Sequence, residues 1–94
     1  MVDKMLIKVT EDHIKAGVQN NACECPVALA LALGGLKDLY ELIEVQGLFV
    51  YLWDSADRPE HVTVPLPRIA QDFVRDFDSS KDVSPFEFEF DVPE

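Results

Sequence analysis

Basic residues are scarce in this chain, and the shortage limits what it can bind. Its 94 residues include 8 Lys and Arg against 18 Asp and Glu, so the formal net charge is −10. Proteins that bind nucleic acid directly need a basic surface for the phosphates. Docking on an anionic membrane surface makes the same demand. We therefore expect neither nucleic acid nor a membrane as a direct partner.

Cysteine and long apolar runs are also in short supply. Two cysteines are too few for a disulfide scaffold. No uncharged stretch approaches the ~20 apolar residues that a bilayer-spanning helix needs. The first residues, Met1 to Lys4, lack the basic region followed by an apolar run that marks a signal peptide. Together these absences predict a cytoplasmic protein.

The apolar content, by contrast, is that of a folded domain. Hydrophobic residues make up 48% of the chain, which is too many for a disordered protein. A chain of this length buries roughly 60–65% of its unfolded surface, enough for one small core. We expect residues 1–94 to form a single domain.

The first third of the chain predicts a strand and two helices. Residues 4–9 alternate as a half-buried strand does. Thr10 is typical of a helix N-cap and Gly17 of a C-cap, so a short helix is expected over residues 11–16. The strand's predicted inward residues are Met5, Ile7 and Val9.

A second helix is expected to begin at Pro26, which suits the first helical position. Residues 27–33 carry no charge, which predicts a helix that is buried all round, Leu29 and Leu31 included. Gly34 and Gly35 then end it.

Residues 42–45 and 48–53, joined by Gln46 and Gly47, predict a β-hairpin or two strands with a tight bend. The second of these strands is apolar on both faces. It is therefore either central in a sheet covered on both sides, or one of its faces meets a partner. A polar turn is expected over residues 54–60.

The last third predicts a strand, a helix and a strand. Residues 61–66 alternate, a helix starts at Pro67, and residues 86–92 alternate most clearly of all. The expected inward residues of the first strand are Val62, Val64 and Leu66. Those of the helix are Ile69, Ala70, Phe73, Val74 and Phe77, and those of the last strand are Phe86, Phe88, Phe90 and Val92. The whole pattern predicts an α+β domain of order β-α-α-β-β-β-α-β, with a mostly antiparallel sheet and helices packed on one face.

Cys23 and Cys25 are the first candidates for chemistry. They precede Pro26 at a helix N-terminus, where the helix dipole lowers the pKa of a thiol. A reactive thiolate or half of a metal site would use them, with His13 as a further weak candidate ligand. Their Cys-x-Cys spacing is not the two-residue spacing usual in zinc and dithiol sites. We therefore expect structural cysteines, no metal and no cofactor.

Motifs of catalysis are missing. The phosphate-loop, dinucleotide-binding, nucleophile-elbow and His-Glu-x-x-His patterns do not occur. His13 has no nucleophile or carboxylate partner marked by spacing. The sequence predicts a protein that is not an enzyme.

Acidic residues concentrate toward the C-terminal end. Residues 54–94 hold 11 acids and 4 bases, a net charge of −7. Carboxylates on one face of a strand recur at about 6.6–6.8 Å, a row that can imitate backbone phosphates or simply solvate the fold. The candidate partner-binding residues on the last strand are Glu87, Glu89 and Asp91, and those on or just after the last helix are Asp72, Asp76 and Asp78.

One stretch resembles a known group of proteins. Val9 to Gly17, followed by Cys23 to Ala30, is similar to the opening of small uncharacterised bacteriophage and prophage proteins. Those carry a Val-Thr-x-x-His-Ile-x-x-Gly segment and then a Cys-Pro-Val-Ala-Leu-Ala helix start. The ending Pro85 to Phe88 is similar to their last strand. The resemblance covers about half the chain. It implies a phage setting, a compact accessory protein in the host cytoplasm, and no catalytic residues.

The function expected is therefore that of a small acidic binding protein. Its acidic face, a DNA mimic in one version, would dock on a basic host protein that handles nucleic acid or acts in defence. Two alternatives stay open. One is a homodimeric accessory protein, because an uncovered apolar sheet face is economically covered by a second copy. The other is a small metal- or thiol-dependent module that uses Cys23 and Cys25.

Overall fold

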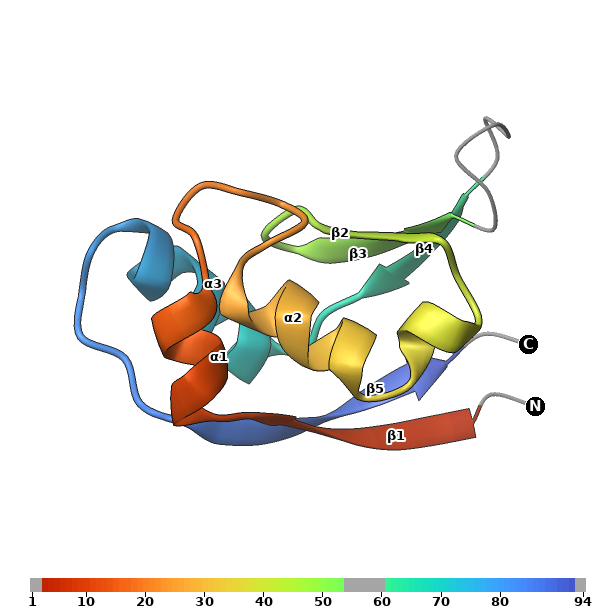
Figure 1. Ribbon diagram of the computed structural model, residues 1–94, viewed down its shortest axis with the longest axis horizontal. Helices are drawn as coiled ribbons and strands as arrows, with labels where there is room; N and C mark the ends of the chain where they lie inside the picture. Colours follow the sequence, from red (N-terminus) through yellow and green to blue (C-terminus); the bar gives the residue numbers. More distant parts are fainter. Residues whose placement is uncertain (1–2, 54–60, 93–94) are drawn as a thin grey trace.

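The computed structural model describes residues 3–53 and 61–92 (Figure 1). The polar turn expected over residues 54–60 lies outside the described residues. The α+β class and the order β-α-α-β-β-β-α-β are confirmed. The elements are β1 (Asp3–Val9), α1 (Glu11–Ala16), α2 (Pro26–Leu33), the 3-10 turn η1 (Leu36–Asp38), β2 (Leu42–Val45), β3 (Phe49–Trp53), β4 (Val62–Pro65), α3 (Arg68–Asp78) and β5 (Phe86–Val92).

The strands are antiparallel, as predicted, but they form two sheets rather than one. β1 pairs with β5 along its whole length, and β3 lies between β2 and β4 in a second sheet. The helix α2 contacts both β1 and β2, and Figure 1 shows it between them. Because α2 carries no charge, it can bury two sides at once. The helix α2 thus packs between the two sheets, where a single continuous sheet was expected.

The prediction that α2 is buried all round is wrong at its end. Val27 and Leu31 are fully buried, whereas Leu29 is half-buried and Leu33 is 73% exposed. Leu33 is the last helical residue before the chain breaks at Gly34. The chain then turns through Gly34 and Gly35 into η1, which contacts α2 but leaves Leu33 exposed.

Two local contacts fix how α1 enters and leaves. Thr10 caps α1 by accepting a hydrogen bond from the His13 backbone N–H, and the His13 ring accepts one from the Thr10 backbone N–H. At the other end Gly17 lies against Pro26. A Cβ atom at Gly17 would stand 2.6 Å from the Pro26 ring, so the chain reversal into α2 requires glycine.

Two inward assignments on β4 and α3 are also wrong. Val62 opens β4, an edge strand, and is 40% exposed, while Val64 and Leu66 are buried as expected. Ile69 is 53% exposed because the apolar stripe of α3 starts one residue later. That stripe consists of Ala70, Phe73, Val74 and Phe77 at i, i+3, i+4 and i+7.

The alternation of β1 and β5 gives the first sheet one buried and one charged face. The Phe88 and Phe90 side chains are buried toward the core, together with Ile7 and Val9. We call the opposite face the charged face; it consists of Lys4, Leu6, Lys8, Glu87, Glu89 and Asp91, all exposed. Within the two described segments, no helix is both long and apolar enough to cross a bilayer.

Candidate functional site

Cys25 has a structural role at the start of α2. Its Sγ caps the helix by accepting a hydrogen bond from the Ala28 backbone N–H at 3.4 Å, and the side chain is buried. Burial raises the pKa of the Cys25 thiol, although hydrogen bonds from the Ala28 and Val27 backbone act in the opposite direction. The thiol is therefore protonated at neutral pH, and it is neither a nucleophile nor a ready metal ligand.

Cys23 is exposed but is also not activated. Desolvation raises the pKa of its thiol first, and the carboxylates of Glu44 and Glu24 raise it further. The sequence-based expectation that the start of α2 lowers the pKa of this thiol is therefore wrong, because partial burial first and the two carboxylates second raise it. Two residues apart in sequence, the cysteines thus occupy different environments.

The weak metal candidates Cys23, Cys25 and His13 are not brought together. Residues 3–53 and 61–92 contain no cluster of three or more His, Cys, Asp or Glu that could hold a metal ion. The His13 Nδ1 atom is engaged in the α1 cap, where it accepts the Thr10 backbone N–H at 3.0 Å. His13 therefore closes the helix start.

The two thiols predict a simple labelling result. A small alkylating reagent at neutral pH should modify Cys23 slowly in the folded protein and leave Cys25 untouched, because Cys25 is only 3% exposed. Raising the pH should speed the reaction of Cys23, because more thiolate forms. Mass spectrometry would count one label in buffer and two in urea. Two labels in buffer at equal rates would contradict the structural role of Cys25.

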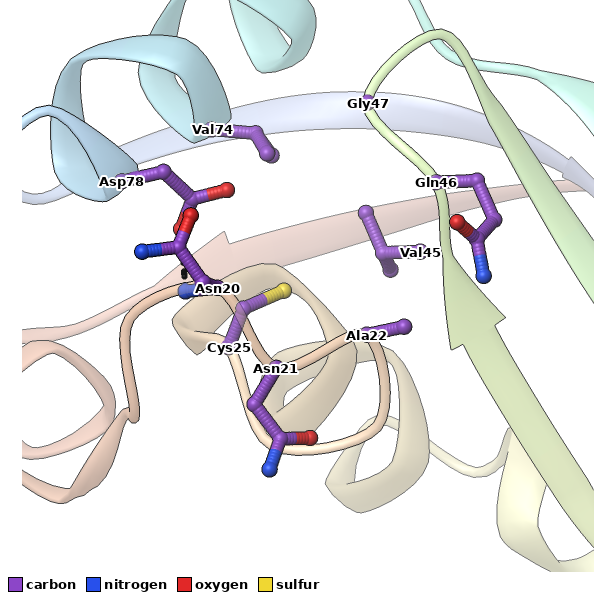
Figure 2. A pocket seen from close by; sticks show the side chains of 9 residues that line it. All are labelled: Asn20, Asn21, Ala22, Cys25, Val45, Gln46, Gly47, Val74 and Asp78. Atoms are coloured by element: carbon purple, nitrogen blue, oxygen red, sulfur yellow. Dashed lines mark hydrogen bonds between the residues drawn. The ribbon is translucent and has the colours of Figure 1, made fainter.

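A pocket of about 330 Å³ lies beside Cys25, between the 20–25 loop, the β2–β3 turn and α3 (Figure 2). The Cys25 sulfur points into it, and Val45 and Val74 line it with apolar surface. Its polar residues are Asn20, Asn21, Gln46 and Asp78.

Three polar side chains of this pocket, those of Asp78, Asn21 and Gln46, already have partners in the fold. Asp78 accepts the Asn20 backbone N–H at 3.0 Å, which ties α3 to the loop. The Asn21 side-chain oxygen accepts backbone N–H groups of Cys23 and Glu24, also at 3.0 Å. Gln46 donates to Glu44 at 3.1 Å. The Asp78 carboxylate also helps to raise the pKa of the Cys25 thiol, so the pocket does not activate that thiol, and its hydrogen bonds hold the loop in place.

The three acids of β5 do share one face, as their alternation predicts, but lysines lie among them. The strand register sets Lys8 opposite Glu87 and Lys4 opposite Asp91. Lys4 Nζ also lies 3.8 Å from a Glu89 carboxylate oxygen, with both side chains about two-thirds exposed. Such an exposed pair contributes only about 0–1 kcal/mol. Because of these lysines, the three carboxylates of β5 do not form the uninterrupted series of negative charges that a phosphate backbone presents.

The three acids of α3 lie apart from that row and are paired differently. Asp72 lies within 3.6 Å of Arg68 and 3.4 Å of Arg75. Asp76 lies 3.4 Å from Arg75 and 3.9 Å from Lys81. Asp78 holds the loop, as described above. Two of the three acids of α3 therefore lie against basic side chains of their own helix or against Lys81, whereas the acids of β5 face the lysines of β1.

A groove joins the acids of β5 to the start of α3. It encloses about 440 Å³, and we call it the β5–α3 groove. Pro65, Pro67 and the exposed Ile69 form its apolar wall, and Glu89 and Asp91 form its acidic wall. Lys4 also lines the groove, beside these two acids. This groove therefore brings two candidate acids, Glu89 and Asp91, next to the exposed aliphatic side chain of Ile69.

Sequence reasoning placed the acidic wall but missed the apolar one. Ile69 was assigned to the core because it precedes Phe73 by four residues. The signal that would have found it is the complete stripe from Ala70 to Phe77, which already fills one helix face. Pro65 is exposed at the end of an edge strand, a position typical of proline.

The groove must be interpreted from its own chemistry, because the comparisons with known proteins add no relative. No protein-family model, no curated protein and no solved structure matches this chain.

Proposed function

We propose that this protein is a non-enzymatic binding protein that docks on a basic partner protein through the β5–α3 groove. The observation that carries the proposal is the exposed Ile69 beside Glu89 and Asp91. Protein interfaces commonly combine an apolar centre with a polar or charged rim. An apolar side chain of the partner would fill the groove, and flanking basic side chains would meet the two carboxylates.

The charge of the chain supports a basic partner. With a net charge of −10, the protein attracts cationic surfaces over a distance of several ångströms and repels anionic ones. Electrostatic attraction of this kind mainly speeds association. It follows that binding should weaken as salt is added.

Proteins that handle nucleic acid present basic grooves, so they are the class of partner we favour. The resemblance to phage proteins fits a host protein of this kind, in nucleic-acid handling or defence, met in the host cytoplasm. Phosphate mimicry is the less favoured version, because Lys4 and Lys8 interrupt the acidic row. Recognition by an acid-flanked apolar groove needs no such mimicry.

The cysteines and histidines give the alternative of a thiol- or metal-dependent module no support. Burial and nearby carboxylates disfavour both thiolates. His13 is engaged in a helix cap, and His61 lies against two aromatic rings. A binding role needs none of these groups to react.

The double change Glu89→Gln, Asp91→Asn tests the acidic wall. It should slow association with a basic partner and flatten its salt dependence, with an affinity loss of about 2- to 10-fold for two exposed charges. The partner would be captured from host lysate at about 50 mM salt, identified, and released at about 500 mM. Surface plasmon resonance with the purified partner would then give the rates.

Two variants make this test specific. Glu87→Gln removes a carboxylate from the same strand face but not from the groove, so it should change the rates less. Ile69→Ser should speed dissociation while leaving the salt dependence unchanged, because it removes apolar contact without altering charge. If all three variants bind like the wild type, the carboxylates only solvate the surface and the proposal fails.

A further inference from the structure

The β2–β4 sheet has an aromatic face turned away from the core, and the groove uses none of its aromatic residues. Along β3, Val50 and Leu52 point inward, so Phe49, Tyr51 and Trp53 point outward. The register places Glu44 and Thr63 on either side of Tyr51, and Pro65 beside Phe49. We call this surface the β3 aromatic face; it consists of Leu42, Glu44, Phe49, Tyr51, Trp53, His61, Thr63 and Pro65.

The rings on this face form a connected cluster. His61 lies 4.5 Å from Trp53 between ring centroids, at an interplanar angle of 33°. It meets Tyr51 edge-on, at 4.9 Å and 83°. Phe49, farther along the strand, is 40% exposed. Tyr51 and Trp53 are half-buried as residues, and the Trp53 indole N–H is buried without a hydrogen-bond partner among the described residues.

The described residues that define this face include one acid, Glu44, and no Lys or Arg. Glu44 lies directly opposite Tyr51 in the strand register, and its carboxylate accepts a hydrogen bond from the Gln46 side chain at 3.1 Å. Aromatic rings attract cations through their negative faces, and a neighbouring carboxylate strengthens the attraction. Arginine suits such a site best, because its planar guanidinium stacks on rings and pairs with carboxylates.

We propose that the β3 aromatic face binds arginine side chains of a basic protein segment, which stack on Tyr51 and Trp53 beside Glu44. The proposal rests on the proposed function for the charge of the partner, but its aromatic and acidic residues lie on a separate sheet, and it shares only Pro65 with the groove. The acid-flanked groove and the aromatic face would then bind two parts of one basic surface.

Charge decides against a second copy of the chain as the occupant. Two copies packed face to face through this sheet would place one Glu44 carboxylate from each copy in the interface, and the described residues of the face supply no lysine or arginine to offset them. Each copy would also bring a net charge of −10. An arginine-rich segment would instead neutralise the Glu44 carboxylate and part of the net negative charge of the protein.

Trp53 is the only tryptophan in the chain, so its fluorescence reports on this face directly. A short peptide of alternating arginine and serine should quench or shift the emission in a saturable way. The same peptide with glutamine in place of arginine should leave it unchanged. Glu44→Gln should lower the affinity for the arginine peptide by about two- to fivefold, as expected for loss of one exposed charge.

Tyr51→Leu keeps the apolar bulk but removes the ring, and it should also lower the affinity for the arginine peptide by about two- to fivefold. Thr63→Ala is the matched control, because Thr63 lies directly opposite Tyr51 and has no ring. The Thr63→Ala variant should bind like the wild type. Circular dichroism would first confirm that each variant is folded.

The remaining outcomes separate this inference from the groove. The inference would be overturned if the glutamine peptide quenched the Trp53 emission as strongly as the arginine peptide. It would also fail if Tyr51→Leu bound the arginine peptide as tightly as the wild type, or if no concentration of that peptide changed the emission. A change of emission with protein concentration alone would assign the face to a second copy and overturn it too. If the Glu89→Gln, Asp91→Asn variant loses the peptide while Tyr51→Leu retains it, the groove binds arginine and the aromatic face does not.

Discussion

Replacing Leu31 with Asp is expected to abolish soluble folding. Leu31 is fully buried in α2, the helix that contacts both sheets. A carboxylate there has no described partner and must either stay charged in an apolar setting or take up a proton at a cost. The loss of about 4–5 kcal/mol or more approaches the whole stability of a small domain. Soluble yield and far-ultraviolet circular dichroism would measure it.

Leu33→Asp is the matched control, since it makes the same substitution in the same helix. Leu33 is 73% exposed, so this variant should fold and lose no more than about 0.5 kcal/mol. Equal loss of folding in both variants would point to helix propensity rather than burial. If both variants melted at the temperature of the wild type, α2 would be a peripheral helix.

Replacing Phe90 with Ala should have the second-largest effect. Phe90 is the largest fully buried side chain, and it lies opposite Met5 on the inward face of the β1–β5 sheet. Removing its ring loses buried apolar area and leaves a cavity, at a cost of about 3–5 kcal/mol. Urea unfolding followed by circular dichroism would show a lower midpoint with a similar slope.

Phe49→Ala provides the comparison from the other sheet. Phe49 is 40% exposed on the β3 aromatic face, so the same truncation should cost much less, about 1 kcal/mol. If Phe90→Ala cost no more than Phe49→Ala, the two-stranded sheet would not belong to the common core.

Local patterns predicted the elements well because each has its own signal. Thr10 and Gly17 bracket α1 through cap chemistry that acts over a few residues. Pro26 and Gly34 do the same for α2. In β5 the alternation is unbroken, and each apolar position from Phe88 onward is buried.

Long-range packing was harder to predict because it depends on residues far apart in the chain. Whether β1 and β5 join the other strands is decided by α2, which contacts strands from both sheets. The exposure of Val62 depends on β4 being an edge strand. A pattern of apolar residues does not contain that information.

The candidate site divides in the same way. That Glu87, Glu89 and Asp91 share one face follows from strand periodicity alone. Lysines lie opposite Glu87 and Asp91 because of the β1–β5 register, which pairs residues about 80 positions apart. The apolar wall at Ile69 comes from yet another element. The groove is thus visible in three dimensions but not along the sequence.

The most direct test of the binding claim is to map a cationic ligand onto the protein by amide NMR. The probe is a lysine-rich peptide with a single central leucine, titrated into isotopically labelled protein at low salt. The proposal predicts chemical-shift changes that centre on Ile69, Glu89 and Asp91, fade at high salt, and shrink when the leucine is replaced by serine. Changes that leave these residues untouched, while the peptide binds elsewhere or not at all, would contradict it.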